Sequence, residues 1–340
     1  MRRLRLTVAA LATASMVLAG CGGGDDEAAP PNQDSSQAPE TTPEEPAEPA
    51  TWPLTGLPVE GDGDGSADHP VYVVKVDNTG PSRPQVGLGS ADLVVEELVE
   101  GGSTRLAVFF YSQLPEQVGP VRSMRASDIG IVKPVAGEMV TSGAASKTYR
   151  RIQQAGITWH EEGTKGISRD RSRRAPYNVM ANLATLASAA SGGERPADYL
   201  VWGDGSDLPD GEAATTIAAK FSGGQTSRWT WTDEGYALDN DKAGAGDNFV
   251  ATNVLVVRAV LGDAGYKDPA GNPVPETKFE GSGEGVLFHG GKAVEVTWSK
   301  DGVGGQLKLE TADGAAVSVP AGKTWIELVP TSGNAGLSYQ

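Results

Sequence analysis

One cysteine, Cys21, is the whole thiol content of this 340-residue chain. The residues after it cannot form an internal disulfide, so the fold must be held by its hydrophobic core, hydrogen bonds and ion pairs. They also have no thiol for nucleophilic catalysis or metal ligation. Residues 52–340 are long enough to bury the core of one large domain or of two ordinary ones.

Residues 1–20 have the pattern of a bacterial export signal. Three arginines occur in the first five residues, and residues 6–18 are almost wholly apolar, which is too short to span a bilayer as a helix. The Leu-Ala-Gly-Cys sequence that ends at Cys21 is a lipobox, with small residues at the cut and a thiol that can take a diacylglyceryl group. We predict a cleaved signal peptide, lipidation of Cys21, and anchoring to membrane lipid at the outer face of the cytoplasmic membrane.

Residues 21–51 are predicted to be a disordered linker. From residue 22 to residue 51 the chain has eight acids, six prolines and no lysine or arginine, so it cannot bury enough apolar surface to fold. Removing residues 1–20 deletes three arginines and no acid, which changes the formal net charge from -16 to -19. An acidic protein repels nucleic acid, so we exclude a nucleic-acid partner.

The remaining sequence predicts an α+β fold in two parts. Residues 52–234 are expected to form a mixed α/β domain, with a strand at 71–76, which is rich in valine, and helices near 149–155 and 182–190. Residues 235–330 contain short apolar runs separated by turns rich in glycine and aspartate, which is typical of a β-rich domain. Residues 331–340 are expected to be a tail.

Arginine is concentrated in one part of the chain. Ten of the sixteen arginines lie between residues 83 and 174, where Arg122 and Arg125 would share one face if their segment is helical. Arginine binds carboxylates and phosphates through paired N–H groups, so an anion-binding surface is one interpretation, and internal ion pairing is the other. The predicted anion-binding residues are Arg83, Arg105, Arg122, Arg125, Arg169 and Arg173, and the acidic residues of interest are Asp77, Asp92, Glu97, Glu100 and Asp170.

No catalytic set stands out. His69, His160 and His289 lack the spacing of a zinc site, and the sequence has no nucleophile-elbow or phosphate-loop motif. We therefore expect no metal and no cofactor. Paired acids such as Glu97 and Glu100 could support hydrolysis of a glycan, but nothing in the sequence separates them from structural acids.

Several short motifs occur in this order along the chain: Pro53-Leu54-Thr55-Gly56-Leu57-Pro58, Asp77-Asn78, Arg83-Pro84-Gln85-Val86-Gly87-Leu88, Gly119-Pro120-Val121-Arg122-Ser123, Arg169-Asp170, Ala175-Pro176, Asn178, Thr252-Asn253-Val254 and Gly322-Lys323-Thr324-Trp325-Ile326. Together they resemble the YerB-like lipoproteins, a bacterial family whose two parts are catalogued as domains of unknown function with the number 3048. The resemblance implies an extracytoplasmic lipoprotein whose first part is a layered α/β sandwich. The sequence departs from the family pattern at Tyr177, where the pattern has histidine.

Three functions stay open at this point. The first is a non-enzymatic envelope factor that binds an anionic cell-wall component or a membrane protein of peptidoglycan synthesis, because a tether raises the effective concentration near such partners. The second is a hydrolase of cell-wall polymers that uses Asp92, Glu97, Glu100 or Asp170. The third is a solute-binding lipoprotein, which would need a large cleft lined by aromatic residues and arginines.

Overall fold

The computed structural model describes residues 49–340, which belong to one compact unit. The predicted signal peptide, Cys21 and nearly all of the predicted linker lie outside the described residues. Within residues 49–340, no helix has the length and apolar character that a membrane span requires.

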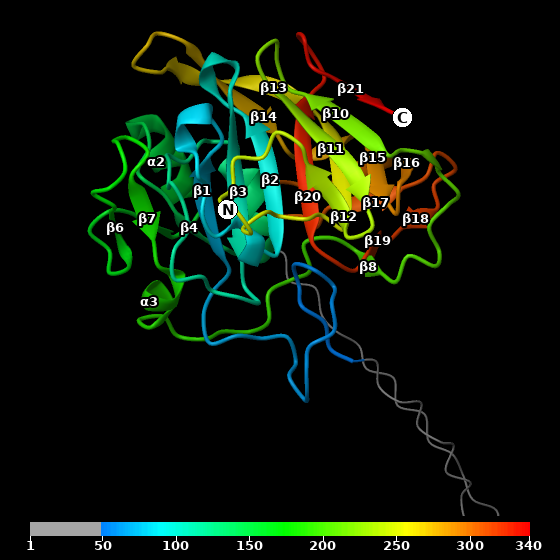
Figure 1. Cartoon of the computed structure of the whole chain (residues 1–340), viewed down its shortest axis with the longest axis horizontal. Coiled ribbons are helices and arrows are strands. Elements are labelled where there is room, and N and C mark those ends of the chain that lie inside the picture. Colours follow the sequence, from blue (N-terminus) through cyan, green and yellow to red (C-terminus); the bar gives the residue numbers. More distant parts are fainter. Residues whose placement is uncertain (1–48) are drawn as a thin grey trace, which may run out of the picture. The chain divides into compact units, whose positions relative to one another are not determined.

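A 13-stranded mixed sheet forms the centre of the molecule, with the main strand order β18-β17-β16-β15-β13-β20-β2-β3-β1-β4-β5 (Figure 1). Two further strands join it from the side, since β14 pairs with β13 and β9 pairs with β16. Its strands are β1 (Tyr72–Asp77), β2 (Leu93–Leu98), β3 (Thr104–Phe110), β4 (Glu138–Val140), β5 (Trp159–His160), β9 (Glu212–Ala213), β13 (Asn253–Lys267), β14 (Pro273–Lys278), β15 (Gly281–His289), β16 (Lys292–Lys300), β17 (Lys308–Glu310), β18 (Ala316–Val317) and β20 (Thr324–Pro330).

Smaller elements cover this sheet. Three α-helices are present in the described residues, and all are short: α1 (Asp128–Val132), α2 (Ser146–Gln154) and α3 (Leu183–Ala187). Four 3-10 turns occur as well: η1 (Gly80–Ser82), η2 (Leu88–Ser90), η3 (Glu100–Gly102) and η4 (Lys133–Val135). The smaller sheets are β12-β11-β10-β21, β6-β7 and β8-β19, built from β6 (Ile167–Arg169), β7 (Val179–Ala181), β8 (Trp202–Gly203), β10 (Thr216–Lys220), β11 (Thr226–Thr232), β12 (Gly235–Leu238), β19 (Val319–Pro320) and β21 (Gly336–Tyr339).

Strand β20 joins the two predicted parts of the chain. It runs parallel to β2 on one side and to β13 on the other, although it follows β2 by more than two hundred residues in sequence. Figure 1 shows β20 in red beside β2 in cyan. The two parts therefore share one continuous sheet, and the predicted boundary after residue 234 stays a prediction.

Both faces of the large sheet are buried, which explains why its central strands are nearly continuous apolar runs. One face packs against the four-stranded sheet, where Trp229 of β11 meets Trp325 of β20 edge to face at 5.1 Å between ring centroids. The other face packs against Ile131 of α1 and Ile152 of α2. In β1, successive residues such as Val73 and Val74 therefore pack into different hydrophobic clusters, one on each face of the sheet.

The structure is mostly sheet with a small helical share, which agrees with the β-rich character predicted for residues 235–330, and the α+β layered sandwich predicted for the first part stays a prediction. The predicted strand at 71–76 is β1, and the predicted helices near 149–155 and 182–190 are α2 and the shorter α3. The segment from Gly119 is extended, because its residues bridge to β1 and to Val86, so Arg122 and Arg125 do not share a helix face. The predicted tail 331–340 contains β21.

Candidate functional site: a buried network of cations and acids

The large sheet brings three charged side chains together where β1 and β2 end and β3 begins. Asp77 of β1 and Glu97 of β2 both lie opposite Arg105 of β3 in the strand register. Residues that face each other across neighbouring strands point to the same side of the sheet, so these three side chains lie in one row. All three are buried.

Lys75 occupies the next position of β1 on the same side of the sheet, two residues before Asp77. Its Nζ donates to Oε1 of Glu97 at 2.8 Å and to Oδ1 of Asp128, at the start of α1, at 2.7 Å. All three side chains are fully buried. Burial raises the pKa of Asp128, and the ammonium of Lys75 offsets part of that rise. A buried lysine that bridges two acids ties β1, β2 and α1 together.

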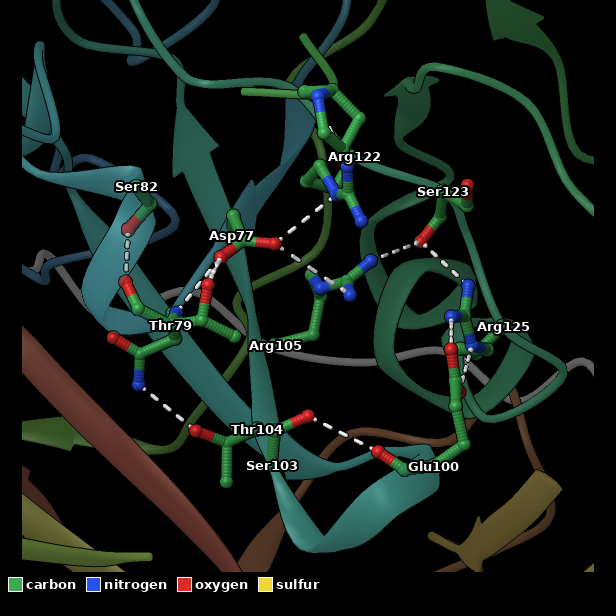
Figure 2. A network of polar contacts seen from close by, with 12 residues as sticks. Asp77, Thr79, Ser82, Glu100, Ser103, Thr104, Arg105, Arg122, Ser123 and Arg125 are labelled. Atoms are coloured by element: carbon green, nitrogen blue, oxygen red, sulfur yellow. Dashed lines mark hydrogen bonds and ion pairs between the residues drawn. The ribbon is translucent and has the colours of Figure 1, made fainter. Parts of the chain in front are cut away.

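Asp77 is shared by two arginines. Its Oδ1 accepts hydrogen bonds from the backbone and the hydroxyl of Thr79, and its Oδ2 lies 3.1 Å from Nε of Arg122 and 3.7 Å from Nη2 of Arg105 (Figure 2). Neither contact to Oδ2 has the geometry of a hydrogen bond, so Oδ2 is a buried oxygen without a donor among the described residues. One carboxylate therefore serves two guanidinium groups.

Arg125 is the best satisfied arginine of the network. It donates through Nε and Nη2 to the carboxylate of Glu100 in η3, and through Nη1 to the backbone oxygens of Ser123 and Met124. Burial raises the pKa of Glu100, but the hydrogen bonds and charge of Arg125 outweigh it, so the pKa lies below its ordinary value. Such bidentate pairs are the strong form of an ion pair.

Arg105 is the least satisfied. Its Nη1 reaches the backbone oxygen of Ser123 at 3.4 Å, its contact to Asp77 is 3.7 Å long, and its Nε has no partner within the described residues. Burial, and after it the positive charge of Arg125, lowers the pKa of Arg105 to about 10. The eight charged members of the network are Lys75, Arg105, Arg122, Arg125, Asp77, Glu97, Glu100 and Asp128.

The loop between β6 and β7 lies next to this network. Arg173 holds the loop in place, because it donates to the backbone oxygens of Tyr177, Ser82 and Pro84 at 3.0, 2.8 and 2.8 Å. Arg122 donates to the backbone oxygen of Pro176 at 3.1 Å. The guanidinium of Arg122 also lies 5.2 Å from the centroid of the Tyr177 ring, in the range of a cation–π contact.

Two other arginines of the loop project into solvent. Arg171 and Arg174 are exposed, and neither makes a side-chain hydrogen bond or ion pair with residues 49–340. They differ in this from Arg169, which pairs with Glu162 through two hydrogen bonds of 2.8 and 2.7 Å. The loop thus presents positive charge on a protein whose formal net charge is -16.

The predicted site residues therefore separate into groups. Those that meet in the network are Arg105, Arg122, Arg125, Asp77, Glu97 and Glu100. Arg83 instead donates to the backbone oxygen of Asp241, and Asp92 accepts from the backbone of Tyr111 and from Ser112. Asp170 only closes the local turn at Ser172.

Sequence reasoning missed Lys75 and Asp128. A signal for Lys75 was present, because a lysine inside a valine-rich strand needs either an exposed face or a buried acid. Asp128 gave no such signal, since it lies 53 residues from Lys75 and only the fold brings them together. Among the described residues, no group of three side chains is suited to hold a metal ion.

A cavity of about 470 Å³ lies apart from the network, over β13, β15 and β16. Arg258, Glu284, Glu295 and Leu337 are among its lining residues, and none belongs to the network or to the arginine loop. Its walls carry acids and few large apolar groups, which does not match the aromatic- and arginine-lined cleft expected of a solute-binding lipoprotein.

Comparison with known proteins gives consistent matches over most of the chain. The N-terminal and C-terminal domains of a protein of unknown function, DUF3048, match residues 54–195 and 217–326. "Putative lipoprotein YerB" of Bacillus subtilis (strain 168) is 27% identical over 316 residues, which cover 84% of this chain and 88% of that protein. A crystal structure of YerB from Bacillus subtilis superposes with a TM-score of 0.69 and 25% identity, covering 85% of this chain and 99% of that one.

Proposed function

The chain belongs to the DUF3048 family, which confirms its resemblance to the YerB-like lipoproteins, and on this premise we propose that it is a lipid-anchored, non-enzymatic factor that binds an anionic component of the cell envelope. The anchor is the acylated Cys21, at the outer face of the cytoplasmic membrane. The binding region is the arginine surface, which we define as Arg122, Arg171, Arg174 and Tyr177.

The observation that carries this proposal is the free charge on a fixed loop. Arg171 and Arg174 are exposed and have no internal partner among residues 49–340, while Arg173 holds the loop backbone to Ser82 and Pro84. A surface arginine that pairs internally must give up its partner before it binds a ligand, whereas an unpaired arginine on a backbone that is already held in place pays only for the ordering of its own side chain. Arg171 and Arg174 can therefore bind an anion without breaking an existing ion pair.

The electrostatics of the whole protein favour a localised contact. A strongly acidic protein is repelled by an anionic polymer everywhere except at a positive surface, so binding is directed to one orientation. Two of the acids that could support hydrolysis have structural partners, since Glu97 accepts from Lys75 and Asp92 accepts from the backbone of Tyr111. These contacts support a binding role over a catalytic one.

The test is sedimentation of the lipidated full chain, in detergent, with purified cell walls. We expect Arg171→Ala/Arg174→Ala to weaken wall binding by roughly tenfold or more, because two charge-assisted contacts are lost. The matched control is Lys220→Ala/Arg228→Ala, which removes two exposed cations from the four-stranded sheet. Equal wall binding by both double variants and by the unmodified protein would refute the proposal.

The same mixture tests the hydrolase alternative. Release of soluble wall fragments by the unmodified protein, lost in Glu100→Gln, would replace the binding role with a catalytic one. Glu100 is the acid to change, because it is partly exposed, whereas Glu97 is fully buried. If the partner is instead a membrane protein of peptidoglycan synthesis, the tethered protein should retain that membrane protein through the arginine surface and should not retain wall material.

A further inference from the structure

We propose that Arg105, Arg122 and Ser123 form a receptor for a single phosphate group, and that Arg105 is the residue that recognises its oxygens. The inference rests on the proposed function, because the receptor would be the specific part of the arginine surface, while Arg171 and Arg174 supply general attraction. The shared chemistry is a phosphate group, whether it belongs to a phosphorylated envelope polymer or to a lipid headgroup.

The main observation is the poor satisfaction of a buried cation. Arg105 is only 4% exposed, yet its contacts of 3.4 Å to the oxygen of Ser123 and 3.7 Å to Asp77 are both long, and its Nε has no partner within the described residues. A buried guanidinium normally has a carboxylate or several carbonyl groups at hydrogen-bond distance, since an unpaired buried charge is very costly. Arg125, its neighbour in Figure 2, has both.

No acid of the network makes a close hydrogen bond with Arg105. Glu97 lies opposite it in the strand register, but Glu97 bonds Lys75 through Oε1 at 2.8 Å, and its Oε2 has no hydrogen-bond partner among the described residues. Asp77 lies closer to Arg122, at 3.1 Å, and gives its other oxygen to Thr79. The whole network holds four cations and four acids, so what Arg105 lacks is an acceptor at hydrogen-bond distance and not an opposite charge.

The directions of the donors favour phosphate over carboxylate. Arg105 comes from β3, whereas Arg122 and Ser123 come from the extended segment after Gly119 (Figure 2). The hydroxyl of Ser123 has no hydrogen bond to another described residue. Donors that approach from different elements suit an anion with oxygens in several directions, and a carboxylate has two oxygens in one plane. The Arg122 side chain is 22% exposed and that of Arg105 is 5% exposed, so a phosphate would reach the receptor from solvent on the Arg122 side.

The experiment titrates the lipidated full chain in detergent with inorganic phosphate, followed by ³¹P NMR line width and by thermal unfolding. We expect saturable broadening and a rising Tm, because a ligand that binds only the folded state stabilises it. Acetate should bind at least tenfold more weakly. Glycerol 3-phosphate and a short-chain, water-soluble phosphatidylglycerol then distinguish a phosphorylated polyol from a lipid headgroup, according to which competes better with inorganic phosphate.

Variants assign the contact to Arg105. We expect Arg105→Lys and Arg105→Met to weaken phosphate binding at least tenfold, and Ser123→Ala, at a partly exposed position, to weaken it severalfold with the fold unchanged by circular dichroism. Phosphate also raises the Tm of proteins in general, because it is excluded from their surfaces, and this effect should persist in every variant. The NMR line width is therefore the measurement that tells specific binding from this general effect.

The receptor and the proposed function fail separately. Arg171→Ala/Arg174→Ala should lose wall binding and keep the affinity for inorganic phosphate. The receptor proposal is overturned if the unmodified protein shows no saturable phosphate signal, if acetate binds equally well, or if folded Arg105→Lys and Ser123→Ala both keep the original affinity. Retained wall binding by the Arg171/Arg174 double variant, with phosphate binding still dependent on Arg105, would refute only the proposed role of the loop.

Discussion

Replacing Lys300 with methionine should make the protein's stability less dependent on pH. Lys300 ends β16 and is 3% exposed, and its Nζ donates to the backbone oxygens of Gly130 at 2.5 Å and Val303 at 3.4 Å. The ammonium also lies 4.1 Å from the centroid of the Phe279 ring. Burial lowers the pKa of Lys300 from 10.5 to about 7, and the more distant carboxylate of Glu280 offsets only part of this effect.

The sign and the size of the effect follow from the two pKa values. The unfolded chain holds this proton more tightly than the folded protein, so the free energy of unfolding rises with pH between the folded pKa of about 7 and the unfolded value of 10.5. The full penalty below the folded pKa of Lys300 is on the order of 5 kcal/mol. Between about pH 6.5 and about pH 9.5, linkage predicts recovery of about 3 kcal/mol.

The assay compares urea unfolding of the unmodified protein and Lys300→Met at those two pH values. Lost hydrogen bonds and the lost contact with Phe279 shift the difference in unfolding free energy by a similar amount at both pH values, so they cancel. We expect the free energy of unfolding of the variant, measured relative to the unmodified protein, to be about 3 kcal/mol more favourable at the lower pH than at the higher pH. A difference that changes by less than about 1 kcal/mol between the two pH values would refute the reasoning about the buried ammonium.

Three further predictions concern the network and its surroundings. Burial, and after it the charge of Glu96 opposite on β2, raises the pKa of Glu327, so the free energy of unfolding should fall as pH rises above the unfolded pKa of 4.5. In Glu327→Gln this loss should be absent, and an equal fall in both proteins between about pH 5 and about pH 8, measured by guanidinium unfolding, would contradict the prediction. Lys75→Met leaves two buried acids without their cation and should cost about 3–5 kcal/mol in urea unfolding, so a loss below about 1 kcal/mol would argue against the buried bridge. Arg171→Ala/Arg174→Ala, which removes exposed side chains, should change the free energy of unfolding by no more than about 0.5 kcal/mol, which circular dichroism during thermal unfolding can check.

Local sequence determined several elements of this fold. The valine-rich run at 71–76 predicts a strand, and β1 occupies Tyr72–Asp77 because such side chains suit a pleated, buried surface. The helix predicted near 182 begins as α3 after Asn182, whose side chain accepts from the backbone of Thr185, which is the local capping contact such a residue provides. These elements depend on residues a few positions apart, so the sequence alone is enough to predict them.

Arginine composition predicted part of the candidate site. Arg105, Arg122 and Arg125 were selected as arginines of one dense region, and they do meet. The sequence could not predict that Arg83 and Arg169 lie outside the network, because this depends on which acid or carbonyl group each arginine reaches in space.

Only the tertiary structure decided how the charges are distributed. Strand β20 lies beside β2 although the two are far apart in sequence, and Lys75 takes both Glu97 and Asp128. Arg105 consequently shares one carboxylate oxygen, Oδ2 of Asp77, with Arg122. Strand register and ion pairing between distant segments arise from the packing of the whole chain, whereas propensity and composition act locally. The sequence therefore determined which side chains were available, and the sheet determined which of them remained without a partner.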